Sequence, residues 1–64
     1  MTRELAIECV NKFLDSNGYL GERTILCVDQ YSKCFEVQML SPYGLFIVRL
    51  DGSVIDNYDV FKRG

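Results

Sequence analysis

The stretch "FEVQMLSPYGLFIVRLDGSVIDNYDV", residues 35–60, decides the fold. It contains three apolar runs, and turn residues separate them at 41–44 and at Asp51-Gly52. A proline early in a four-residue turn and an Asp-Gly pair are both typical of tight connections between antiparallel strands. The stretch therefore predicts three consecutive strands of a β-meander.

The preceding residues supply a helix and one more strand. Residues 2–17 gather their apolar side chains on one side at the helical period. Thr2 suits the N-cap, and Gly18 can end the helix in the left-handed conformation. The predicted fold is α+β, with an N-terminal amphipathic helix packed on one face of a four-stranded antiparallel β-meander. It forms a single domain, 1–64, with strands at about 24–30, 34–40, 45–50 and 53–58.

Loop lengths predict the strand register. A two-residue type I′ loop at Asp51-Gly52 and four-residue loops at 30–33 and 41–44 agree on one apolar face, because directly opposed residues share a face. In this register Glu36 lies directly opposite Arg49. The face expected under the helix consists of Leu26, Val28, Phe35, Val37, Met39, Phe46, Val48, Leu50 and Ile55.

The opposite face of the predicted sheet is too apolar for a surface that meets only water. Contiguous exposed apolar patches mark interaction sites, so we interpret this face as a protein-binding surface. Alternatively, the C-terminal residues 59–64 fold back and cover part of it with Val60 and Phe61. The candidate binding residues are Ile25, Glu36, Leu45, Ile47, Arg49, Val54 and Tyr58.

Composition argues against several classes of function. The 64 residues carry a net charge of −2 and no histidine, and the seven basic residues are scattered. We therefore expect no enzyme, no metal or other cofactor, no small-molecule substrate and no nucleic-acid partner. No apolar run approaches the roughly 20 residues of a membrane span. Residues 1–20 lack the pattern of a secretory signal, and the three cysteines are odd in number, so free thiols and a cytoplasmic location are expected.

Two segments resemble the PepSY family, which pairs a short helix with a small antiparallel meander. "CFEVQ", residues 34–38, resembles its first strand motif, and "FIVRLDGSVID", residues 46–56, resembles the following strand and hairpin. The likeness covers roughly residues 4–58. It implies a non-enzymatic regulatory or inhibitory binding module.

We therefore expect a small regulator or inhibitor that binds another protein through the second sheet face. A phage or another mobile element would be a natural source of such a chain. The alternative is a self-assembling, homodimeric structural protein that uses the same face.

Overall fold

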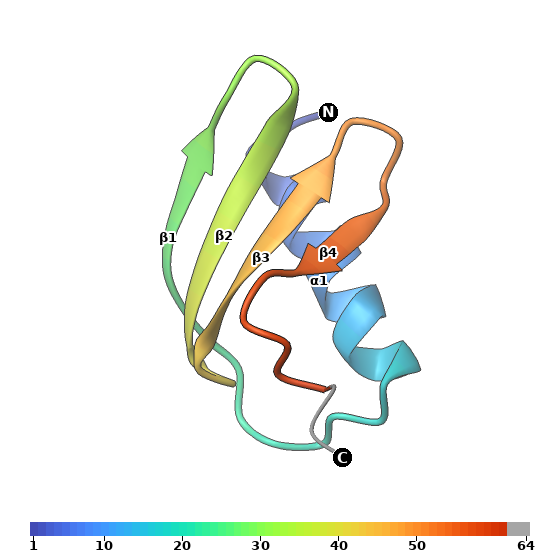
Figure 1. Ribbon diagram of the computed structural model, residues 1–64, viewed down its shortest axis with the longest axis vertical. Coiled ribbons are helices and arrows are strands. Elements are labelled where there is room, and N and C mark those ends of the chain that lie inside the picture. Colours follow the sequence, from blue (N-terminus) through green and yellow to red (C-terminus); the bar gives the residue numbers. More distant parts are fainter. Residues whose placement is uncertain (62–64) are drawn as a thin grey trace.

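The computed structural model describes residues 1–61 and contains one helix and four strands. The strands form one antiparallel sheet in the order β1-β2-β3-β4, and α1 lies behind it in Figure 1. The predicted α+β fold is confirmed. Observed and expected bounds differ by at most one residue, except at β4, which is much shorter than expected. The elements are α1 (Arg3–Ser16), β1 (Thr24–Gln30), β2 (Cys34–Ser41), β3 (Gly44–Arg49) and β4 (Val54–Asp56).

Both ends of α1 are capped as the sequence predicts. The Leu5 backbone N–H donates to Thr2 Oγ1 at 3.2 Å, which satisfies one of the free donors of the first turn. At the other end Gly18 has φ +74°, and the Tyr19 N–H donates to the Leu14 carbonyl at 3.0 Å. These caps fix where the helix begins and ends above the sheet.

The core lies between α1 and the side of the sheet that faces α1, called here the inner face. The rings of Phe13 and Phe46 meet edge to face, with centroids 5.9 Å apart, and join the two layers. The buried residues are Ala6, Val10 and Leu14 of α1, with Val28, Phe35, Val37, Met39, Phe46 and Val48 of the sheet. Most of the expected inner-face residues are thereby confirmed.

The C-terminal residues close one end of this core. Val60 and Phe61 pack against it, and the Phe61 ring lies 5.9 Å from that of Phe13. Val60 Cγ2 comes within 2.8 Å of the position a Cβ would take at Gly44, so this strand end must lack a side chain. The alternative that Val60 and Phe61 cover the opposite side of the sheet is therefore wrong. Residues 62–64 of that call lie outside the described residues.

The register between β2 and β3 differs from the prediction by two residues. Val37 lies opposite Phe46, and Phe35 lies opposite Val48. The connection is tighter than the expected four-residue loop, and its Ser41–Pro42 peptide bond is cis. A two-residue shift keeps every side chain on its expected side, so the faces of β2 and β3 were predicted correctly.

The register between β3 and β4 differs from the prediction by one residue. As a result, each side chain of β4 lies on the face opposite to the one expected. The Arg49 N–H donates to the Ser53 carbonyl at 2.9 Å, so the loop comprises residues 50–52. Of these only Gly52 has a positive φ, +90°, so the expected type I′ turn is wrong. Val54 consequently packs on the core, whereas Ile55 and Leu50, both expected inside, are exposed.

β1 contains an irregularity that places two more residues on faces opposite to those expected. Its pairing with β2 shifts between Ile25 and Cys27, which is the pattern of a β-bulge. Ile25 and Val28 therefore both contact the core, although they are three residues apart. Leu26 was expected inside and is exposed.

Candidate functional site

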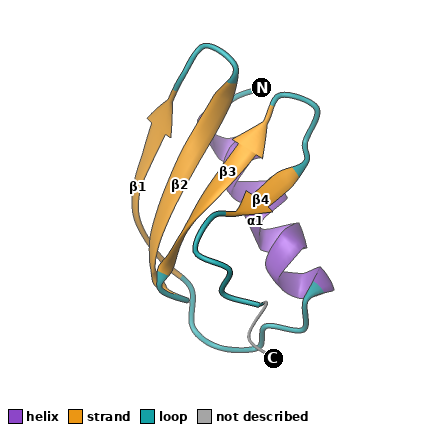
Figure 2. Cartoon of the chain, in the orientation of Figure 1, coloured by secondary structure: helices purple, strands orange, loops and turns teal. Residues whose placement is uncertain are grey.

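The sheet surface that faces away from α1, called here the outer face, is the candidate site. Figure 2 shows the strands as one layer with the helix behind them, so within residues 1–61 no helix covers this side of the sheet. The register puts three rows of side chains on it, because opposed residues share a face. The first row is Tyr31, Cys34 and Arg49, the second Asp29, Glu36, Ile47 and Ile55, and the third Cys27, Gln38 and Leu45.

Four of the seven predicted binding residues lie in these rows, namely Glu36, Leu45, Ile47 and Arg49. A fifth, Tyr58, follows β4 and is exposed. Ile25 and Val54 lie on the inner face against the core, so their prediction as surface residues is wrong. The bulge in β1 and the three-residue loop before β4 caused these two errors.

Sequence reasoning missed several exposed residues beside the predicted ones. Tyr43 is 65% exposed, and its ring centroid lies 6.0 Å from that of Tyr58. Leu40 is 54% exposed, and Ile55 is 37% exposed. Tyr43 lies in the turn between β2 and β3, as the sequence predicts, and its ring extends the exposed surface toward Tyr58. Leu40, Tyr43, Leu45 and Tyr58 make the end of the outer face beside the β2–β3 turn apolar, which is the lower end of the sheet in Figure 1. Ile47 and Ile55 lie in the same row as Asp29 and Glu36.

The upper part of the outer face carries charge of both signs. Arg49 lies opposite Cys34, while Glu36 lies opposite Ile47, so the expected direct Glu36–Arg49 opposition is wrong. Within residues 1–61 neither of them has an ion pair. The pKa of Tyr31 is raised, mainly by the negative charge of Glu36. Partial burial and the charge of Asp29 contribute less. This end is therefore a mixed-charge region beside an apolar one.

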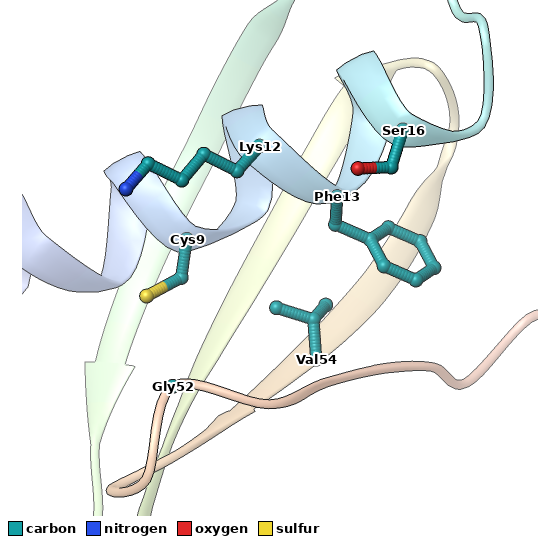
Figure 3. Close-up of a pocket in the computed structure, with 6 residues that line it drawn as sticks. All are labelled: Cys9, Lys12, Phe13, Ser16, Gly52 and Val54. Carbon is teal, nitrogen blue, oxygen red and sulfur yellow. The ribbon is translucent and has the colours of Figure 1, made fainter.

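A shallow groove lies on the other side of the molecule, between α1 and the β3–β4 hairpin (Figure 3). Its volume is about 380 Å³. In Figure 3 the side chains of Phe13 and Val54 point toward each other across it, and the Cys9 sulfur points toward Gly52. It is lined by Cys9, Lys12, Phe13, Ser16, Gly52 and Val54. The groove presents one ammonium group and no carboxylate, so it lacks an acid–base pair.

The cysteines are free, as expected, and lie apart in the fold. Cys27 is exposed on the outer face, with its sulfur 3.5 Å from Gln38 Oε1, whereas Cys9 and Cys34 are half-buried. In residues 1–61 no three His, Cys, Asp or Glu side chains gather as metal ligands would. The described helix is too short and too polar to cross a membrane.

The chain matches no protein-family model, no curated protein and no solved structure. The resemblance to the PepSY family therefore stays a prediction, and the candidate site depends on geometry alone.

Proposed function

We propose that the protein is a non-enzymatic protein-binding domain, which regulates or inhibits another protein through its outer face. The observation that carries this proposal is the exposed apolar surface on the side of the sheet opposite α1. Antiparallel sheets with a solvated face normally alternate to polar residues there. Here the alternate positions of β3 hold Leu45 and Ile47 instead.

The residue types on the outer face suit a protein contact. Tyrosine and arginine are enriched among residues that contribute most to binding energy. The face offers Tyr31, Tyr43 and Tyr58, all at least about half exposed, with Arg49 at its charged end. Aliphatic neighbours would exclude water around such anchors, while Glu36 and Arg49 would set specificity.

The wider setting in this proposal is a reducing, cytoplasmic one. Three unpaired thiols, one of them exposed, are stable where glutathione and thioredoxin keep cysteine reduced. The absence of histidine from the sequence also supports a role without general acid–base catalysis.

The test is a tagged chain carrying Ile47→Asp, compared with wild type and with Leu20→Asp. Leu20 is 97% exposed in the loop after α1, so the control makes the same chemical change away from the outer face. Ile47→Asp should keep its circular dichroism spectrum, because its carboxylate can remain in water. It should lose the captured target at least about 10-fold, because binding would bury that carboxylate without a partner.

Equal recovery of the target by wild type and by folded Ile47→Asp would contradict the proposal. Loss of the target by both substituted chains would also contradict it, since the outer face would then have no special role.

A further inference from the structure

The longer free edge of the sheet is that of β1. Figure 1 shows β1 as the outermost strand, with β2 on one side of it and no strand on the other. It has seven residues, Thr24–Gln30, whereas the edge strand on the far side of the sheet, β4, has three. Natural edge strands are commonly shielded by short length, by proline or by lysine. β1 contains neither proline nor lysine, so its sequence does little to prevent pairing with another strand.

The hydrogen-bond pattern shows which backbone groups of β1 lie on this free edge. The Tyr31 N–H donates to the Cys34 carbonyl at 2.8 Å, so the backbone groups of Tyr31 point toward β2. Backbone direction alternates along an antiparallel strand. Asp29 therefore also points its N–H and C=O toward β2, whereas Val28 and Gln30 point theirs away from it.

Most of these outward groups have no partner within residues 1–61. The Val28 carbonyl accepts a hydrogen bond from the Arg3 guanidinium on α1, which confirms that Val28 points away from β2. In the same part of the chain no hydrogen bond is formed by the Val28 N–H or by the N–H and C=O of Gln30. A strand laid along β1 could bond these three groups, and the Val28 carbonyl as well if Arg3 moved aside. The edge is therefore a preformed pairing site for an extended segment.

Asp29 gives this edge a charge preference. Its side chain lies on the outer face, and it takes part in no ion pair within residues 1–61. Its neighbour on β2 is Glu36, and like charges directly opposite each other are unfavourable. In an added strand, the residue opposite Asp29 would lie on the same face, about 4.5–5.5 Å away. A lysine or arginine at that position would pair with Asp29 and offset the repulsion.

The residues next to that cation would lie on the inner face. Val28 is almost fully buried there, at the margin of the core. An apolar residue opposite Val28 would extend the core by one strand, and the burial of its side chain would favour binding. The segment that fits β1 therefore alternates apolar and basic residues.

We propose that the free edge of β1 binds an extended segment of a partner protein, which joins the sheet as a fifth strand with a lysine or arginine opposite Asp29. This contact is separate from the outer-face contact described above, because Ile47 lies on β3, two strands away from β1. The two proposals can therefore fail independently.

The test uses a blocked peptide, acetyl-Ser-Thr-Val-Lys-Val-Thr-Ser-amide, in an NMR titration of the isotope-labelled chain. At millimolar peptide, the range expected for a weak contact, the amide signal of Gln30 should shift. Hydrogen exchange at this amide should also slow, because the N–H gains a partner. The Asp29 amide already points to β2, so its exchange should change less.

Two methylated peptides separate backbone pairing from attraction between side chains. A methyl group on the backbone nitrogen of the first valine would face β1 and remove a donor, so affinity should fall at least about 10-fold. The same group on the backbone nitrogen of the lysine would face away from β1 and should be tolerated. Replacement of the lysine by glutamate should also weaken binding, and Asp29→Lys should reverse that preference.

Gln30→Pro makes the matching change in the protein. It removes the outward N–H and leaves the bonds to β2 in place, and proline is tolerated at such positions of edge strands. The variant should remain folded by circular dichroism and bind the peptide at least about 10-fold more weakly than Gln30→Ala does. If it failed to fold, the methylated peptides would still decide, because they are tested on the unmodified chain. Ile47→Asp should bind the peptide as wild type does.

Equal binding of the two methylated peptides would overturn the inference, and so would a Gln30 amide that does not respond to millimolar peptide. A wild-type dimer with a slowly exchanging Gln30 amide would also overturn it, because a second copy would then occupy the edge. None of these results affects the proposed function, which is decided by the comparison of Ile47→Asp with Leu20→Asp.

Discussion

The two faces of the sheet come from the same strands and differ in how deeply their side chains are buried. Along β2, Phe35, Val37 and Met39 are almost completely buried under α1. Their neighbours Glu36 and Gln38 remain partly exposed. Residues that alternate along one strand thus separate two tasks. The inner face determines stability, and the outer face is available for contact with another protein.

The largest expected effect is at the centre of the inner face. Phe46 is fully buried and meets the Phe13 ring, so Phe46→Ala should cost about 3–5 kcal/mol of unfolding free energy. The whole domain is stabilised by roughly 3–10 kcal/mol, so much of the population should unfold. Urea denaturation measures this, with Ile47→Ala as the control on the outer face. If the control lost as much stability, the division between the two faces would fail.

The loop before β4 decides which of its residues lie inside. Gly52 has φ +90°, and a Cβ there would meet only Cys9 Sγ at 3.9 Å, so conformation rather than space is limiting. Gly52→Val should therefore cost about 1–3 kcal/mol. Gly52→Asn should cost less, because asparagine tolerates positive φ better than a β-branched residue does. Melting temperatures of the wild type and the two variants would be compared. Equal values for all three would contradict the three-residue loop with a positive φ at Gly52.

The reversed register of β4 makes a smaller but sharper prediction. Val54→Ala should cost about 1 kcal/mol, from roughly 0.8 kcal/mol per buried methylene reduced for partial exposure. Ile55→Ala should cost less than 0.5 kcal/mol, since most exposed substitutions fall within that range. Chemical denaturation of the two variants decides the point. The opposite order would restore the register expected from a type I′ turn.

The mildest test concerns charge on the outer face. Glu36 is the main cause of the raised pKa of Tyr31, because its negative charge opposes formation of the phenolate. Glu36→Gln should lower the pKa of Tyr31 toward the ordinary tyrosine value. An alkaline titration of the Tyr31 ring signals by NMR would show the shift. An unchanged pKa would mean that Glu36 points away from this end of the face.

Hydrophobic pattern and turn signals were enough to predict the fold class, the helix and the faces of β2 and β3. They were insufficient for the exact register, because both faces carry apolar residues and alternation then penalises a wrong pairing only weakly. A two-residue shift at Ser41–Pro42 leaves the pattern unchanged, so alternation could not detect it.

The candidate site was predicted only in part for the same reason. Asp51-Gly52 is compatible with a two-residue loop and with a three-residue loop whose last residue has positive φ, and these differ by one position in β4. Because of this one-residue difference, Ile55 lies on the outer face, where Val54 was expected. The bulge in β1 has no marker such as glycine among residues 25–27, so the inward position of Ile25 could not be anticipated.

The most direct test of the two-faced sheet places the same substitution at adjacent residues of β3. Val48 is fully buried and Ile47 is only half-buried on the outer face. Val48→Asp should unfold the chain, because an unpaired carboxylate would lie in the core, and Ile47→Asp should remain folded. Circular dichroism of the two purified variants is the measurement. A folded Ile47→Asp beside an unfolded Val48→Asp is the predicted result, and unfolding of both would show that the outer face is part of the core.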